Sequence, residues 1–243
     1  MALSATKKIR KRSRVDLEEQ EQFKLKTKEI NPLTLSQEDA FDYYDDGNHL
    51  VFHGIAGTGK TFISLYLALN DILDDKSKYD KILIVRSVVQ SRDIGFLPGN
   101  VKDKISIYEM PYENICNELF TMKNSYAYLK NKNKLEFQST SFIRGLTFDN
   151  TILIIDEMQN MTSMELHSIL TRIGKNSKFI MCGDYRQNDL LDKKHGQSSG
   201  LKEILKVLEI VKSVKIVDFG IDDIVRSGFV KEYIIARDRL GLS

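Results

Sequence analysis

The sequence of 243 residues contains no tryptophan, only three prolines and only two cysteines, Cys116 and Cys182. Two cysteines cannot build a disulfide framework, and neither has a cysteine or histidine partner at zinc-site spacing, which favours a reducing, cytoplasmic location. No apolar run approaches the roughly 20 residues of a membrane-spanning helix, so we expect no membrane partner. The N-terminus is basic but has no apolar core after it, and it therefore does not resemble a secretory signal peptide.

Negative charge is missing from one end of the chain. Residues 1–14 contain no Asp or Glu, whereas six Lys or Arg residues fall within this stretch. The whole chain has 36 basic and 34 acidic residues, so the remainder is mildly acidic. We predict a basic, mobile arm over residues 1–30 and a folded domain over residues 31–243. Such an arm either binds nucleic-acid phosphates or is a solvated tail without a ligand.

Short apolar runs alternate with helical patterns along the predicted domain. Each run is continuously apolar, as expected of a strand buried on both faces, and the alternation with helices is typical of a parallel sheet. We therefore predict an α/β fold in which helices cover both faces of a parallel sheet and ligands bind at the carboxyl ends of the strands. The predicted strands are residues 49–53, 81–86, 151–155, 178–182 and 215–219, and the predicted helices are residues 36–45, 61–73, 111–130, 163–173, 199–210 and 221–240.

The first predicted strand runs into a glycine-rich loop that opens a helix. This loop matches the phosphate-binding pattern G-x-x-x-x-G-K-[ST] at every position, with the residues Gly54, Ile55, Ala56, Gly57, Thr58, Gly59, Lys60 and Thr61. The glycines allow backbone N–H groups to surround phosphate oxygens. Lys60 would reach the β- and γ-phosphates, and the Thr61 hydroxyl would bind Mg²⁺. The alternative is a glycine-rich turn that matches by chance, but the flanking strand and helix are those that the motif requires.

The third predicted strand ends in two adjacent carboxylates, Asp156 and Glu157. Asp156 fits the acidic residue that, together with Thr61, holds Mg²⁺, in this case through a water molecule. Glu157 fits the base that orients and deprotonates an attacking water. The alternative is a solvated strand end without a ligand. The phosphate-binding loop favours the catalytic interpretation, because two carboxylates at the end of a buried strand need a cation.

The fourth predicted strand also ends in polar residues, among them Asp184, Arg186 and Gln187. In an ATPase of this build, that strand lies between the strand of the phosphate loop and the strand of Asp156, so its end faces the γ-phosphate. Gln187 could sense the γ-phosphate or the attacking water, whereas Asp184 and Arg186 could form a structural pair. The sequence contains neither the guanine motif Asn-Lys-x-Asp nor the transporter signature Leu-Ser-Gly-Gly-Gln.

With these motifs and several others, the chain resembles the PhoH-like protein family, phosphate-starvation-inducible ATPases of bacteria and their phages. The resemblance covers about residues 35–220 and implies a P-loop NTPase with a single RecA-like motor domain, similar to the first motor domain of superfamily 1 helicases. It also implies the cytoplasm of a bacterium or of a phage-infected cell. The stretch after Arg86 departs from the family, in which a proline usually follows the arginine. The other matching motifs are Gly95-Phe-Leu-Pro-Gly99, Pro111-Tyr112, and residues 143–148, 155–160, 170–174 and 183–187.

The resemblance implies roles for particular side chains. Gln37 lies 17 residues before Gly54, as the adenine-reading glutamine of those helicases does, and its amide can pair with N6 and N7 of adenine; a surface glutamine is the alternative. A single motor domain leaves the γ-phosphate open on one side, where catalysis needs an arginine. The candidates are Arg226 as first choice, Arg172 and Arg144, in cis or in trans. An arginine in trans requires a ring or filament, and the family suggests a hexamer.

Together these features predict a protein that binds ATP with Mg²⁺ and hydrolyses it to ADP and phosphate. The helicase-like core, the basic arm and the Gly95–Gly99 loop favour action on RNA or single-stranded DNA, including a possible RNA helicase activity. The alternative is a nucleotide-switched oligomeric assembly protein without a nucleic-acid substrate. A small-molecule kinase is disfavoured, because Asp156 and Glu157 suit the activation of water. No PIN-type nuclease domain is recognisable, so we infer no RNase activity.

Overall fold

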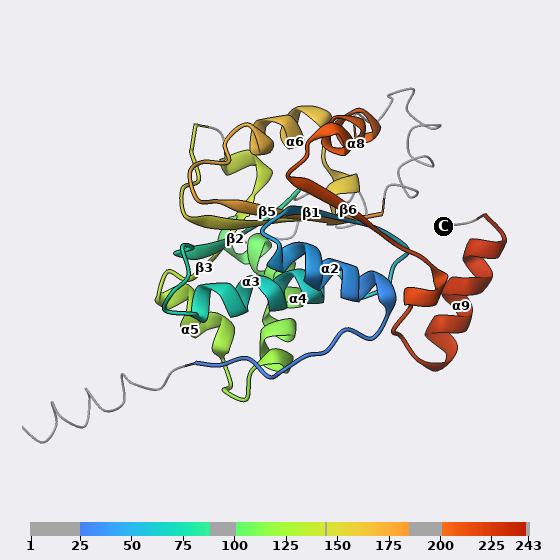
Figure 1. Cartoon of the computed structure of the whole chain (residues 1–243). Coiled ribbons are helices and arrows are strands. Elements are labelled where there is room, and N and C mark those ends of the chain that lie inside the picture. Colours follow the sequence, from blue (N-terminus) through green and yellow to red (C-terminus); the bar gives the residue numbers. More distant parts are fainter. Residues whose placement is uncertain (1–24, 88–100, 144, 185–200, 242–243) are drawn as a thin grey trace, which may run out of the picture.

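The protein is built around a parallel sheet, seen near the centre of the computed structural model in Figure 1. The structure describes residues 25–87, 101–143, 145–184 and 201–241. The six strands lie in the order β3-β2-β4-β5-β1-β6, and each neighbouring pair is parallel. As predicted, the strand of the phosphate loop and the strand of Asp156 have one strand between them. The strands are β1 (His49–Gly54), β2 (Lys81–Arg86), β3 (Leu135–Ser139), β4 (Thr151–Asp156), β5 (Lys178–Gly183) and β6 (Val214–Phe219).

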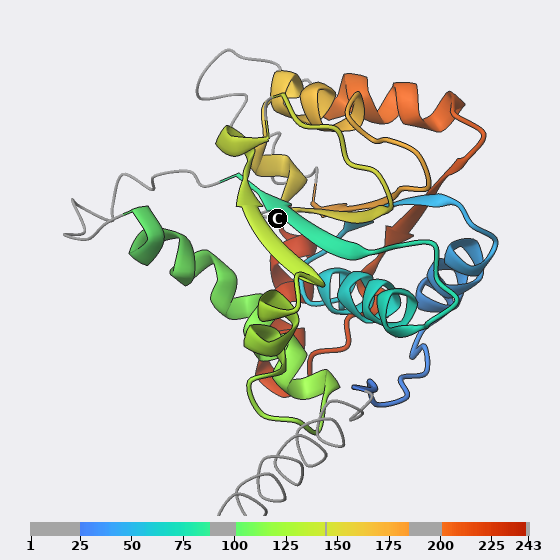
Figure 2. The ribbon, with the colours of Figure 1, turned by 90° about the vertical axis from the view of Figure 1, so that its left-hand side faces the viewer.

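Helices cover both faces of this sheet, which confirms the predicted α/β fold. Figure 1 shows α2, α3, α4 and α5 on one side of the sheet and α6 and α8 on the other, and the view turned by 90° in Figure 2 shows the same layers. α9 lies beyond the end of β6 (Figure 1). The helices are α2 (Leu35–Asp45), α3 (Lys60–Leu73), α4 (Val101–Leu119), α5 (Ser125–Asn131), α6 (Ser163–Leu170), α8 (Leu201–Ile210) and α9 (Gly228–Arg239).

The central strands send alternate side chains into two separate cores. In β4, Ile152 and Ile154 pack into the core that includes α3, whereas Leu153 and Ile155 pack into the core that includes α6 and α8. All four side chains are buried. Burial on both faces explains why β4 is a continuous apolar run, and it leaves the carboxyl edge as the place where its polar residues can act.

An edge strand and a helix boundary differ from the predicted elements. β3 was not predicted, because only its first and last residues are buried and it therefore lacks a continuous apolar run. The predicted helix over residues 111–130 is two helices, α4 and α5. Pro111 lies inside α4 rather than at its start, and α5 is preceded by Asn124 in a left-handed conformation with φ 59°. The break follows from this turn, which no periodicity in the sequence marks.

The two ends of the domain also differ from the prediction. The last helix begins at Gly228 rather than near residue 221, because Ile221–Asp223 form a short 3-10 helix. Residues 25–30, which the prediction assigned to the mobile arm, belong to the folded body. Within this segment, the Ile30 N–H donates to the hydroxyl of Tyr66 on α3 at 3.1 Å.

Candidate functional site

The phosphate-binding loop joins β1 to α3 at the carboxyl edge of the sheet. Gly54 has φ +130°, and a Cβ atom there would lie 2.1 Å from the carbonyl oxygen of Phe219 on β6. Only glycine fits at this position. α3 begins at Lys60, and no side chain caps its N-terminus. Its first backbone N–H groups are therefore available to phosphate oxygens.

Lys60 points back into this loop. Its ammonium group donates to the carbonyl oxygens of Gly54 at 2.9 Å and Ile55 at 2.7 Å, and to the hydroxyl of Thr58 at 3.3 Å. Burial lowers the pKa of Lys60 below its ordinary value, although nearby acidic groups oppose this shift. A phosphate would offer this ammonium charged acceptors in place of neutral carbonyl oxygens, which gives stronger hydrogen bonds.

Thr61 and Asp156 meet beside the loop. The Thr61 hydroxyl donates to Oδ1 of Asp156 at 3.0 Å, and the hydroxyl of Tyr112 on α4 donates to Oδ2 at 2.7 Å. Burial raises the pKa of Asp156, against the effect of these two hydrogen bonds. Within the described residues, no three His, Cys, Asp or Glu side chains gather to hold a metal by themselves. Two oxygen donors are what Mg²⁺ needs from a protein when phosphates and water supply its other ligands.

Glu157 is held by two side chains, those of Gln159 and Arg86. Its backbone is left-handed, with φ 54° and ψ 47°, a conformation that is uncommon outside glycine and often occurs at functional sites. The amide of Gln159 donates to one carboxylate oxygen, and the Arg86 guanidinium at the end of β2 lies 3.9 Å from the other. The amide oxygen of Gln159 accepts the N–H of Asp184, directly after β5, at 3.1 Å.

These groups line an open cavity of about 1230 Å³. Ligand pockets usually measure about 300–1,000 Å³, so this cavity is large enough for a nucleoside triphosphate. Its walls come from the phosphate loop, the ends of the central strands, α4 and the segment before α2. The residues that bear on its chemistry are Gln37, Lys60, Thr61, Arg86, Asp156, Glu157 and Arg226.

Gln37 lies at the cavity on the first turns of α2, with 4% of its surface exposed. Its side-chain N–H donates to the Thr58 carbonyl at 3.2 Å, and its amide oxygen accepts the Leu33 N–H at 2.8 Å. Gln37 is thus buried against the phosphate loop and is not a free surface glutamine. A primary amide has two N–H donors and two acceptor lone pairs, which leaves one of each for a base.

The structure separates the two described arginine candidates. Arg226 lines the cavity, and a Cβ atom at Gly57 would lie 3.1 Å from its Cγ. Arg172, at the end of α6, donates instead to the Leu146 carbonyl at 3.2 Å. Arg172 is not among the described residues that line the cavity.

Several predicted site residues lie outside the described residues. They are Arg144, Arg186 and Gln187, the Gly95–Gly99 loop and the basic residues of the arm. Conversely, sequence reasoning assigned no role to Arg86, Tyr112 or Gln159. Arg86 could have been noticed as a charge that ends a buried strand at the carboxyl edge. Tyr112 belongs to the matching motif Pro111-Tyr112, but the motif does not say what its hydroxyl contacts, because Asp156 is 44 positions away in the sequence.

The sheet order, the phosphate loop and the acidic end of β4 make this domain a P-loop NTPase of RecA-like build. None of its described helices combines the length and the apolar character that crossing a bilayer requires.

Comparisons with known proteins give the same classification. A family model described as PhoH-like protein matches residues 29–237. The chain is 33% identical over 215 residues to Protein PhoH of Escherichia coli strain K12, covering 86% of this chain and 59% of that protein. It is 32% identical over 194 residues to the PhoH-like protein of Bacillus subtilis strain 168, covering 79% of this chain and 59% of that protein. The chain thus spans 59% of the length of these relatives.

Solved structures with a related arrangement are more distant. The large terminase of a thermophilic bacteriophage in complex with ADP matches with a TM-score of 0.49 at 12% identity, over 85% of this chain and 50% of that chain. The Pif1 helicase from Candida albicans matches with a TM-score of 0.39 at 16% identity, over 87% of this chain and 44% of that chain.

Proposed function

The chain belongs to the PhoH-like protein family, and we propose that it binds ATP with Mg²⁺ and hydrolyses it to ADP and phosphate. The observation that carries this proposal is the convergence of the phosphate loop, the Thr61–Asp156 pair and Glu157 on one cavity. Anion donors, oxygen ligands for a cation and a carboxylate base are the groups that phosphoryl transfer to water requires.

Each group then has a distinct task. The N-terminus of α3 and Lys60 bind the β- and γ-phosphates. Thr61 and, through a water molecule, Asp156 would hold Mg²⁺, and the bound ion would neutralise phosphate charge. Glu157 orients a water molecule at the γ-phosphate and accepts its proton. Gln187 would sense the γ-phosphate from the segment after β5.

The base specificity follows from Gln37. Its free N–H and free lone pair can meet the N7 acceptor and the N6 donor of adenine. Guanine presents acceptors at both N7 and O6, so the amide oxygen would face another acceptor. We therefore assign ATP rather than GTP as the nucleotide.

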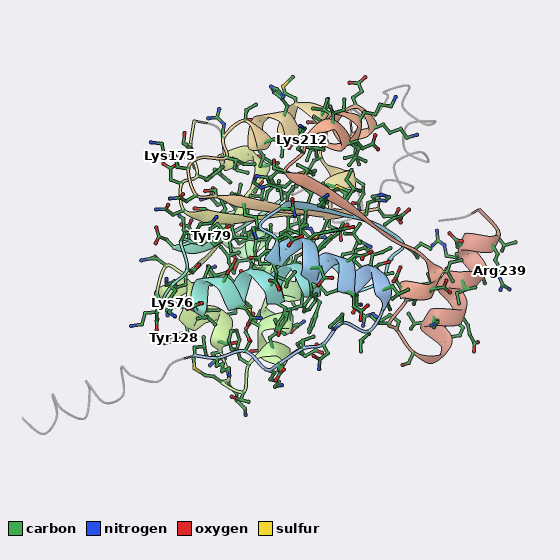
Figure 3. The ribbon with its side chains drawn as sticks, viewed as in Figure 1. Lys76, Tyr79, Tyr128, Lys175, Lys212 and Arg239 are labelled. Atoms are coloured by element: carbon green, nitrogen blue, oxygen red, sulfur yellow. The ribbon has the colours of Figure 1, made fainter. Side chains whose placement is uncertain are left out.

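We assign the charge-stabilising arginine to Arg226 acting in cis, because this side chain lines the cavity of its own chain. Arg226→Ala should lower turnover, with little change in the affinity for ADP. The matched control is Arg239→Ala, at the far end of α9, which Figure 3 labels at the right of the molecule. If Arg226→Ala turns over ATP at the wild-type rate, the arginine comes from elsewhere. Restoration of activity on mixing Arg172→Ala with a Lys60 variant would then favour a trans arrangement.

We propose that ATP hydrolysis drives action on RNA or single-stranded DNA in the cytoplasm, and that the basic arm contacts the phosphates of the nucleic acid. Six contacts would give a slope of log affinity against log salt of about −4 to −5. Deleting residues 1–14 should then abolish stimulation by single strands and leave basal turnover intact. If single strands neither bind nor stimulate, the alternative of a nucleotide-switched oligomer, a hexamer by analogy with the family, is the better account.

The proposed ATPase is tested by Lys60→Met. This change removes the ammonium group from the phosphate loop, so both ATP binding and turnover should fall. The matched control is Lys178→Met, which removes another buried lysine, at the start of β5, away from the cavity. Equal turnover in wild type and Lys60→Met, or equal losses in both variants, would refute the assignment.

A further inference from the structure

Tyr112 links the two carboxylates of the site, Asp156 and Glu157. Its side chain is fully buried on α4. Its hydroxyl donates to Oδ2 of Asp156 at 2.7 Å and lies near the Arg86 guanidinium. Arg86 in turn lies 3.9 Å from Glu157. A single hydroxyl group therefore contacts the proposed ion ligand directly and the proposed base through one cation.

The orientation of Asp156 depends on this contact. A carboxylate has two oxygens, and here Oδ2 is held by Tyr112 while Oδ1 faces Thr61. Without the hydroxyl, Oδ2 would lose a charge-assisted hydrogen bond in a buried position, and only the Thr61 hydroxyl would still hold the carboxylate. Hydrogen bonds behind a metal ligand usually determine how well that ligand meets its ion.

Glu157 is held by a longer chain of contacts. The Arg86 guanidinium lies near the Tyr112 hydroxyl, and its carbon lies 5.8 Å from the centroid of the Tyr108 ring. Both tyrosines lie on α4, one turn apart. The helix thus fixes the cation that accompanies Glu157, and any movement of α4 would change both carboxylates together.

We propose that Tyr112 is a positioning residue: its hydroxyl orients Asp156 toward Mg²⁺ and, through Arg86, holds Glu157 at the end of β4. This inference rests on the ATPase function proposed above. It extends that function by making α4 the element that couples ion binding to water activation.

The test measures the affinity for a fluorescent ADP with and without Mg²⁺. In Tyr112→Phe, the gain in affinity that Mg²⁺ provides should fall about tenfold, while the metal-free affinity stays at the wild-type value. A purely structural defect would weaken both affinities. Tyr126→Phe is the matched control, because Tyr126 is also buried but its hydroxyl has no hydrogen-bond partner among the described residues. It should behave as wild type.

Arg86→Gln tests the link to Glu157 separately from the contact between Tyr112 and Asp156. It leaves the Tyr112–Asp156 hydrogen bond in place, so the gain from Mg²⁺ should persist while turnover falls. An unchanged gain from Mg²⁺ in Tyr112→Phe, or an equal loss in Tyr126→Phe, would overturn the positioning role. If Tyr112→Phe fails to melt cooperatively, Arg86→Gln decides, and unchanged turnover in that variant overturns the link to Glu157. Absence of any nucleotide binding by the wild type would instead overturn the proposed function, and the ion site with it.

Discussion

Replacing the buried Lys178 by methionine should change how the stability of the protein depends on pH. Lys178 is the first residue of β5, and 4% of its surface is exposed. Its ammonium donates to the Tyr44 carbonyl at 2.8 Å and lies 3.5 Å from the centroid of the Tyr44 ring. The ring of Tyr79, labelled in Figure 3 at the side away from α9, lies 5.9 Å from the same ammonium. Burial lowers the pKa of Lys178 from its ordinary value of 10.5 to about 8.

The sign of the effect follows from proton binding. Between these two pKa values the unfolded chain binds the proton of Lys178 and the folded chain does not, so the free energy of unfolding rises with pH. Below about pH 8 both states are protonated, and the full cost of burying the charge is present. The difference in pKa corresponds to about 3.4 kcal/mol in all, of which roughly 2 kcal/mol falls between about pH 7.5 and about pH 9.5.

The assay is urea unfolding of the wild type and of Lys178→Met at several pH values in that window. The wild type should gain about 2 kcal/mol relative to the variant as the pH rises. The difference in stability between the wild type and the variant is compared, because burial also raises the pKa of Cys116 to about 12. Such groups affect both proteins equally and cancel. A difference that stays constant from about pH 7.5 to about pH 9.5 would show that Lys178 titrates normally and would refute the reasoning.

Two further predictions concern the nucleotide cavity. Gly54→Ala should lower the free energy of unfolding by about 3 kcal/mol or more, because the new Cβ would meet the Phe219 carbonyl. In the control Gly47→Ala, where nothing lies within 4 Å and only the left-handed backbone is unfavourable, the loss should be about 1–2 kcal/mol; equal losses in urea unfolding would contradict the steric argument. Gln37→Ala should reduce the preference for ATP over GTP in competition binding, and an unchanged preference would mean that another group reads the base.

Much of the architecture could be predicted from local patterns. A strand buried on both faces is a continuous apolar run, so β1, β2, β4 and β5 were all visible in the sequence. The phosphate loop and the acidic end of β4 were visible as well, because each combines a motif with a flanking element of the required type. The edge strand β3 was not visible in this way, because too few of its side chains are apolar.

The contacts behind the site could not be predicted in the same way. Tyr112 meets Asp156 across 44 positions of sequence, and this contact depends on how α4 lies against the sheet. The Arg86–Glu157 pair depends likewise on β2 and β4 being neighbours. The sequence predicts a helix that starts only at Pro111, so it does not place Tyr108 on the same helix as Tyr112. Motifs thus identify the groups that touch a ligand, whereas packing determines the groups that orient them.

The most direct test of the central claim, that this cavity hydrolyses ATP, is a comparison of ATP binding and turnover in wild type and Glu157→Gln. The account predicts that the variant binds Mg²⁺-ATP as the wild type does but turns it over about 10²–10⁴-fold more slowly. Glu136→Gln, a half-exposed glutamate on β3 paired with Lys81, should leave both quantities unchanged. Turnover by Glu157→Gln at the wild-type rate would contradict the account.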